Sequence, residues 1–128
     1  MSIKCLVVED AQFIREIYRF SLRGSNIEII DVAADGHEAI EKIKLLKPDL
    51  IILDLILPLK NGLEILKEMA QISPRSKCLV ISSIDDEEIL LKAKALGAIA
   101  YLTKPFTKAQ LLQTVEVVTK DYSEVQSG

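Results

Sequence analysis

The sequence is poor in the residues that bind soft metals or build disulfide frameworks, because it has two cysteines and one histidine. Cys5 and Cys78 both lie in apolar, strand-like runs, so we expect buried thiols that pack as small hydrophobic groups. A zinc site would need more thiolate or imidazole ligands than these residues supply. The single histidine, His37, lies in a polar run and is expected at the surface.

The sequence also lacks an excess of basic residues and long apolar runs. Its 16 Lys and Arg against 19 Asp and Glu give a net charge of −3, which argues against nucleic acid as a direct partner. No apolar run approaches the roughly 18 residues of a membrane-spanning helix, and the first residues lack the apolar region of a signal peptide. We therefore expect a cytoplasmic protein without a membrane partner.

What the sequence does contain is a regular alternation of strand and helix patterns. The expected strands lie at residues 3–8, 27–33, 50–53, 78–81 and 98–102. Each is followed by a helical pattern, and this strict alternation predicts an α/β fold: a doubly wound parallel sheet with helices on both faces. No internal repeat or linker is present, so we expect one domain over residues 1–120 and a flexible C-terminal tail over 121–128.

The fourth helix is preceded by an acidic run from Asp85 to Glu88. Asp85 followed by Glu88 fits a capping box for a helix over residues 86–96. We interpret these charges as helix-start residues favoured by the helix dipole, rather than as a metal site.

The third strand, Leu50–Leu53, is apolar throughout and is followed directly by Asp54. A strand that is apolar on both faces belongs in the middle of a parallel sheet, and ligands of open α/β sheets bind at the carboxyl ends of the strands. A lone carboxylate among leucines and isoleucines is costly unless its charge is used. Aspartate is also common in turns, so this segment alone leaves both a functional and a turn-capping Asp54 open.

Other polar residues are expected at the same edge of the sheet. Glu9 and Asp10 follow the first strand, Ser82 closes the fourth, and Lys104 follows the fifth. Three converging carboxylates would repel one another unless a cation lay between them, and oxygen-only ligands suit Mg²⁺ or Mn²⁺. A lysine ammonium and a serine hydroxyl nearby suit a phosphoryl group. Each motif alone has an ordinary explanation, such as a helix cap, but their combination favours phosphoryl chemistry.

The motifs on which a family resemblance depends are Glu9-Asp10, the run D-L-I-L-P-L-K-N-G over residues 54–62, Ser82, Tyr101 and Lys104-Pro105-Phe106. With them the chain resembles the receiver domain of two-component response regulators, from Ile3 to about Lys120. The resemblance implies a flavodoxin-like receiver fold with five strands in the order 2-1-3-4-5 and five helices. It also implies a cis peptide bond between Lys104 and Pro105, which proline makes accessible.

The resemblance further implies a Mg²⁺ (or Mn²⁺) site beside a phosphoacceptor. Asp54 resembles the phosphoacceptor and Asp10 the direct metal ligand. Glu9 resembles the acid that holds metal-bound water. The backbone carbonyl of Ile56 would complete the site. The first acid is Glu where Asp is commoner in the family, and this change should preserve metal binding.

Three more residues resemble the phosphoryl-binding and switch positions of the family. Ser82 corresponds to the hydroxyl that turns toward the phosphoryl oxygen, and Tyr101 to the aromatic residue that turns inward with it. Lys104 would pair with the phosphoryl group. Phosphorylation would then change the face made by the fourth helix, the fifth strand and the fifth helix.

The function implied is that of a single-domain, chemotaxis-regulator-like response regulator. Asp54 would accept a phosphoryl group from a sensor histidine kinase or phosphotransfer protein. The chain would be a signalling phosphoprotein rather than an enzyme, with autodephosphorylation left open. Because no output domain follows in the sequence, we expect the signal to leave through a protein contact. A relay intermediate that passes the phosphoryl group onward is the alternative.

Three other classes fit the sequence less well. Haloacid-dehalogenase-like phosphatases carry a second aspartate two residues after the nucleophile, where this chain has Ile56. Flavodoxin-like carriers cradle a phosphate after the first strand, where Glu9 and Asp10 would repel it. No P-loop or dinucleotide-binding glycine motif is present. A degenerate receiver that serves only as a binding module would not need the complete set of acids, serine and lysine.

Two pairs of apolar residues concern the lifetime of the acyl phosphate and the docking of a kinase. Ile56 and Ile84 lie two positions after the expected phosphoacceptor and switch hydroxyl, where family residues influence attack by water on the acyl phosphate; we expect them to lengthen its lifetime. Phe13 and Phe20 lie seven apart on the first helix, near the edge of its apolar stripe. They are either peripheral core residues or an exposed edge that docks a kinase.

Overall fold

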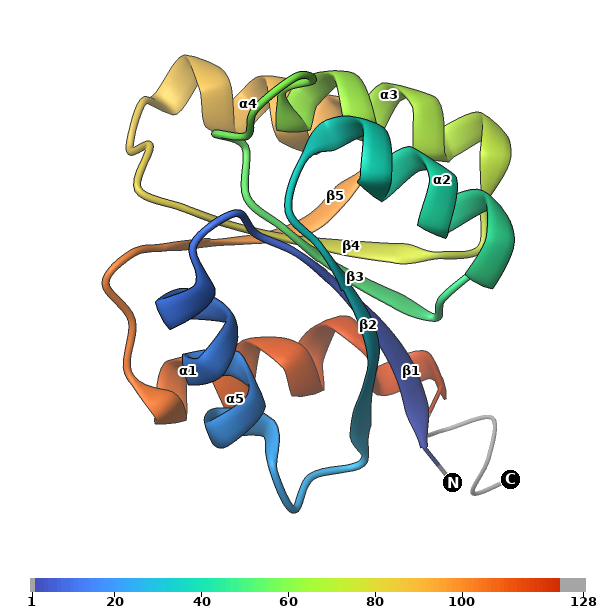
Figure 1. Cartoon of the computed structure of the whole chain (residues 1–128). Coiled ribbons are helices and arrows are strands. Elements are labelled where there is room, and N and C mark those ends of the chain that lie inside the picture. Colours follow the sequence, from blue (N-terminus) through green and yellow to red (C-terminus); the bar gives the residue numbers. More distant parts are fainter. Residues whose placement is uncertain (1, 123–128) are drawn as a thin grey trace.

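The computed structural model describes residues 2–122, which form five strands and five helices in strict alternation (Figure 1). In chain order these are β1 Ile3–Val8, α1 Gln12–Leu22, β2 Ile27–Ala33, α2 Gly36–Leu46, β3 Leu50–Leu53, α3 Gly62–Ile72, β4 Lys77–Ser82, α4 Glu87–Ala95, β5 Ala98–Thr103 and α5 Lys108–Val118. All strand pairs are parallel and the order is β2-β1-β3-β4-β5. The predicted fold class and strand order are confirmed.

The helices cover both faces of the sheet, as Figure 1 shows: α1 and α5 lie on one side, and α2, α3 and α4 on the other. Each face has its own apolar core, so residues of one strand alternate between the two cores. β3 lies at the centre, and its four residues are at most 1% exposed. The continuous apolar run of this strand is therefore explained by burial on both faces.

The helix starts follow the expected cap chemistry with one correction. Thr107 and Gln110 form a capping box at α5. At α4, however, the N-cap is Asp86, whose Oδ1 accepts hydrogen bonds from the N–H groups of Glu88 and Ile89 at 2.8 and 3.2 Å. The predicted cap at Asp85 is wrong by one position, because in this acidic run several carboxylates can reach the first free N–H groups.

The last described residues pack against the domain. The Tyr122 hydroxyl donates a hydrogen bond to the carbonyl of Asp49 at 3.0 Å, and Lys77 pairs with Asp121 at 2.9 Å. Packing thus continues two residues into the segment that the sequence analysis assigned to a tail. The rest of that segment, residues 123–128, lies outside the described residues.

Other predictions from composition concern the core and the surface. Cys5 and Cys78 are buried and unpaired, and burial raises the pKa of the Cys5 thiol to about 12. His37 is exposed, as predicted. Among residues 2–122, no helix is long and apolar enough to cross a membrane.

Candidate functional site

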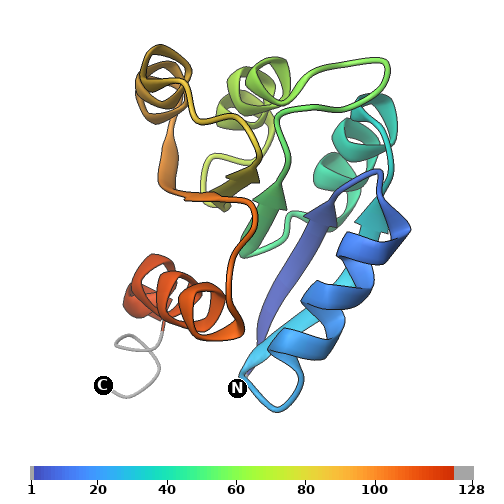
Figure 2. The ribbon, with the colours of Figure 1, turned by 90° about the vertical axis from the view of Figure 1, so that its left-hand side faces the viewer.

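The candidate site lies at the edge of the sheet where the strands end, on the left in Figure 1. Parallel strands bring all their carboxyl ends to one edge, so residues far apart in sequence meet there. Figure 2 views the molecule from this side, with the loop that follows β3 at the top right and the loop that follows β1 below it. The polar residues predicted after β1, β3 and β5 converge at this edge.

Lys104 joins two carboxylates that come from different strands. Its Nζ donates to Glu9 Oε1 at 2.5 Å and to Asp54 Oδ2 at 2.9 Å. The side chains of Glu9 and Asp54 are only 2% and 8% exposed, and that of Lys104 is 17% exposed. Burial by itself would lower the pKa of Lys104, but the hydrogen bonds and charges of the two carboxylates raise it, so the ammonium stays charged.

Glu9 is held in place through its backbone as well as its side chain. Its N–H donates to the carbonyl of Ala33 at 2.9 Å, and its own carbonyl accepts from Arg15 Nη1 at 2.7 Å. The second carboxylate oxygen accepts from the N–H of Ala11 at 3.2 Å. Burial raises the pKa of Glu9, with a smaller contribution from the charge of Asp54, whereas Lys104 and the Ala11 N–H oppose that rise. A second cation at this edge would further favour the charged carboxylate.

Asp54 sits at a close approach between β3 and the start of α3. Its N–H donates to the Val8 carbonyl at 3.0 Å, and its Oδ1 accepts from the N–H of Ile56 at 3.0 Å. The N–H of Gly62 donates to the Leu55 carbonyl at 2.9 Å. A Cβ at Gly62 would lie 2.5 Å from Leu55 Cα and 2.8 Å from the Asp54 carbonyl, so glycine is required there.

The three acids form a group of oxygen donors. Glu9, Asp10 and Asp54 each offer a carboxylate oxygen, and these oxygens lie within 4.8 Å of one another. Asp10 is exposed, whereas the other two are buried, so the group opens to solvent on one side. A cluster of carboxylates without thiolate or imidazole suits a hard divalent ion such as Mg²⁺ or Mn²⁺.

A second set of polar contacts connects the ends of β4 and β5. Ser82 is fully buried, and its carbonyl accepts from the Lys104 N–H at 2.9 Å. The Tyr101 hydroxyl donates to the carbonyl of Ile84 at 2.8 Å, so β5 is hydrogen-bonded to the loop that precedes α4. Burial raises the pKa of Tyr101, which keeps its hydroxyl a donor. The Lys104–Pro105 peptide bond is cis, as the resemblance implied.

Comparison with known proteins decides the family. Residues 5–116 match the response regulator receiver domain. The chain belongs to this family. It is 32% identical to the chemotaxis protein CheY of Thermotoga maritima over 94% of this chain and 100% of the relative. It is 34% identical to CheY of Halobacterium salinarum over 92% of this chain and 98% of the relative.

A solved structure of a receiver relative is a complex that includes BeF3 and Mg²⁺. The CheX-CheY-BeF3-Mg²⁺ complex of Borrelia burgdorferi contains a chain that matches this one with a TM-score of 0.87 and 28% identity, over 91% of this chain and 88% of that chain. Receiver domains of the CheY type are signalling proteins. The receiver family also occurs within enzymes. One example is the protein-glutamate methylesterase of Methanospirillum hungatei, of whose length this chain covers 31%.

Two residues that position this receiver site were not identified from the sequence. Arg15 supports Glu9 through the hydrogen bond described above. Tyr18 stacks on Phe106 with ring centroids 5.7 Å apart and an interplanar angle of 1°, which packs α1 against the loop that follows Lys104. The sequence pattern assigns Tyr18 to the apolar stripe of α1, but it does not indicate which aromatic residue it meets.

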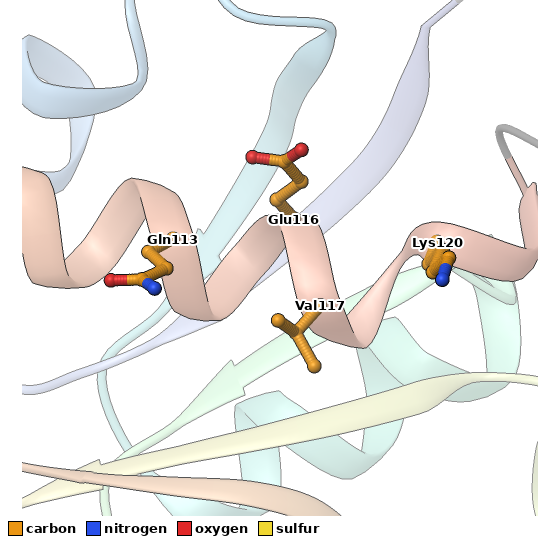
Figure 3. A pocket seen from close by; sticks show the side chains of 4 residues that line it. All are labelled: Gln113, Glu116, Val117 and Lys120. Atoms are coloured by element: carbon orange, nitrogen blue, oxygen red, sulfur yellow. The ribbon is translucent and has the colours of Figure 1, made fainter.

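The receiver site opens to solvent at Asp10, which is exposed. A surface hollow of about 410 Å³ lies elsewhere, along α5, and Figure 3 shows that Glu116 and Val117 point to different sides of that helix. The hollow is lined by Gln113, Glu116, Val117 and Lys120. None of these residues belongs to the acidic group or contacts Lys104 in the interactions described above.

The contacts of Lys104 predict the stability of a Lys104→Met variant. Without the ammonium, two buried carboxylates lose their counter-ion, so the free energy of unfolding in EDTA should fall by about 2 kcal/mol. This loss is smaller than the loss expected for a fully enclosed ion pair, because water reaches this edge of the sheet. Adding Mg²⁺ should restore part of this loss, since the ion would neutralise the same carboxylates. Urea unfolding followed by circular dichroism measures both quantities.

The matched control is Lys77→Met, because Lys77 pairs with Asp121, whose side chain is 75% exposed. Removing such a surface pair should change the free energy of unfolding by less than about 1 kcal/mol. Equal losses for the two variants would contradict the assignment of a special role to Lys104.

Proposed function

We propose that this receiver domain accepts a phosphoryl group on Asp54 from a phosphohistidine of a sensor histidine kinase or phosphotransfer protein, in a Mg²⁺-dependent reaction, and passes the signal on through a protein-binding face. The observation that carries the proposal is the Lys104 ammonium 2.9 Å from Asp54 Oδ2, beside the group formed by Glu9, Asp10 and Asp54. This arrangement supplies a nucleophile, a fixed cation and oxygen ligands at one open edge.

The carboxylates of Asp10 and Asp54 and the backbone carbonyl of Ile56 would hold Mg²⁺ (or Mn²⁺), with Glu9 orienting water on the ion. The fit rests on the donor set, because all side-chain ligands are oxygens and lie within 4.8 Å of one another. When bound, the ion neutralises negative charge that develops on the transferring phosphoryl group.

The residues of the chain have distinct tasks in the transfer. An oxygen of Asp54 attacks phosphorus, an O–P bond forms, and the P–N bond to the donor imidazole breaks with its electron pair leaving on the imidazole. Lys104 shifts part of its hydrogen bonding from the carboxylates to the phosphoryl oxygens. Most of the rate enhancement would come from position and fixed charge, because the protein has little covalent chemistry to perform.

The signal would leave through the contacts between β4 and β5. The Ser82 hydroxyl would turn toward the phosphoryl group, and Tyr101, whose hydroxyl donates to the Ile84 carbonyl, would turn inward with it. The face beyond these residues carries exposed apolar side chains on α4, β5 and α5, which a partner protein would cover. These side chains are Leu91, Ile99 and Val117.

The direct test is phosphorylation of the purified chain with Mg²⁺ and acetyl phosphate. Intact mass should show one added phosphoryl group per chain, and the Asp54→Asn variant should show none, because an amide is not a nucleophile for this reaction. Omitting Mg²⁺ should abolish the addition. A chain that stays unmodified with both ion and donor, or that is modified in the Asp54→Asn variant, would refute the proposal.

The lifetime of the phosphorylated form is expected to depend on Ile56 and Ile84. Ile56 is 54% exposed and Ile84 is partly buried, so both can lie beside the path of an attacking water molecule. The double variant Ile56→Asn/Ile84→Glu offers polar groups that orient water, so we expect dephosphorylation to be faster by about tenfold, equivalent to roughly 1.4 kcal/mol of barrier. Decay of the phosphorylated mass measures the rate; an unchanged rate would disprove the assignment.

The kinase-docking role of α1 is supported by the exposure of Phe13 and Phe20, which are 75% and 64% exposed and therefore not peripheral core residues. Phe13→Glu should slow phosphotransfer from the cognate kinase by about tenfold, as expected for loss of an aromatic anchor, without lowering the melting temperature. Leu45→Glu is the matched control, because Leu45 is 81% exposed on α2, on the other side of the sheet. Similar rates for both variants would exclude the docking role.

A further inference from the structure

The loop between β3 and α3 contains a tight turn of unfavourable backbone geometry. The N–H of Lys60 donates to the Pro58 carbonyl at 2.8 Å, and Leu59 between them has a φ of +70°, so the three residues form a γ-turn with positive φ. Branched side chains rarely adopt this conformation. The side chain of Leu59 is 72% exposed, so burial of that side chain does not hold the turn in place.

The turn is held instead by the first residue of α2. The N–H of Gly36 donates to the Pro58 carbonyl at 3.1 Å. A Cβ at Gly36 would lie 2.2 Å from Lys60 Cβ and 2.4 Å from the Lys60 carbonyl oxygen. Carbon atoms in contact are normally about 3.5–4.0 Å apart, so any side chain at this position would push the turn away by about 1 Å or more.

The same loop begins at the phosphoacceptor. The N–H of Ile56 donates to Asp54 Oδ1 at 3.0 Å, and the Leu55 carbonyl accepts from the N–H of Gly62. The loop is thus fastened by hydrogen bonds at its two ends and by Gly36 in the middle. A displacement of the turn therefore has to be absorbed between Ile56 and Lys60, next to the carboxylate of Asp54.

We infer that Gly36 is a positioning residue for the metal and phosphoryl site: by admitting Lys60 at close range, it fixes the β3–α3 loop and with it the backbone of Ile56. The inference rests on the proposed function, because it concerns the site at which Mg²⁺ and the phosphoryl group would bind. Gly36 touches neither; it acts through the turn formed by Pro58, Leu59 and Lys60.

The test compares Gly36→Ala with His37→Ala, a substitution at the adjacent exposed residue of the same helical turn. Titration calorimetry with Mg²⁺ alone gives the dissociation constant, and phosphorylation by acetyl phosphate at saturating Mg²⁺ gives the rate. We expect Gly36→Ala to weaken Mg²⁺ binding about tenfold and to slow phosphorylation, and His37→Ala to change neither. Wild-type Mg²⁺ affinity and rate in a Gly36→Ala protein, even one with a lowered melting temperature, would overturn the inference.

A second pair of variants applies if Gly36→Ala does not fold. Lys60→Ala and Lys60→Gly both lose the ion pair between Lys60 and Glu68, which spans 2.7 Å, but only Lys60→Gly loses the Cβ that rests on Gly36. Weaker Mg²⁺ binding in Lys60→Gly than in Lys60→Ala supports the inference, and equal binding overturns it. Failure of the proposed function is distinguished from failure of this inference, because in that case the wild-type chain itself would take up no phosphoryl group.

Discussion

The structure depends on placing one ammonium between two buried carboxylates contributed by different strands. Glu9 follows β1, Asp54 follows β3 and Lys104 follows β5, and the strand order leaves β4 between the last two. Lys104 therefore reaches across the end of β4, where the Ser82 carbonyl accepts its backbone N–H. Removing one partner of a buried ion pair leaves an uncompensated charge, which costs more free energy than the intact pair contributes. The ammonium therefore fixes the relative positions of three strand ends.

The same interaction leaves part of the negative charge at the site without a counter-ion. Lys104 neutralises only part of the charge of the three acids, and burial still raises the pKa of Glu9. A divalent ion would balance the charge that Lys104 leaves on the three acids, and Lys104 could then exchange one carboxylate for a phosphoryl oxygen. A site that is stable without ligand but keeps uncompensated negative charge has reason to bind a cation.

Much of this could be predicted from the sequence because the relevant patterns are local. The apolar run of β3 and the helical spacing in α1 each fall within one element, and parallel topology alone brings strand ends together. Other features depend on atoms that meet across long sequence separations. The contact of Gly36 with Lys60, the hydrogen bond from Arg15 to Glu9 and the positive φ of Leu59 leave no local signal. The exposure of Phe13 was undecided for the same reason, since helical spacing does not reveal how far a neighbouring element extends.

The distribution of burial also indicates where a change at the site would be expressed. Helix α4 buries only Ala93, whereas α3 buries Ile65, Leu66 and Met69 in addition to Gly62. A helix with so few buried contacts costs little to displace, and the Tyr101 hydroxyl is hydrogen-bonded to the loop that leads into it. A phosphoryl group that draws the Ser82 hydroxyl and Tyr101 inward would therefore move α4 rather than α3. The tight packing of α3 and the looser packing of α4 on the same face of the sheet would thus direct a change at Asp54 toward the surface of α4.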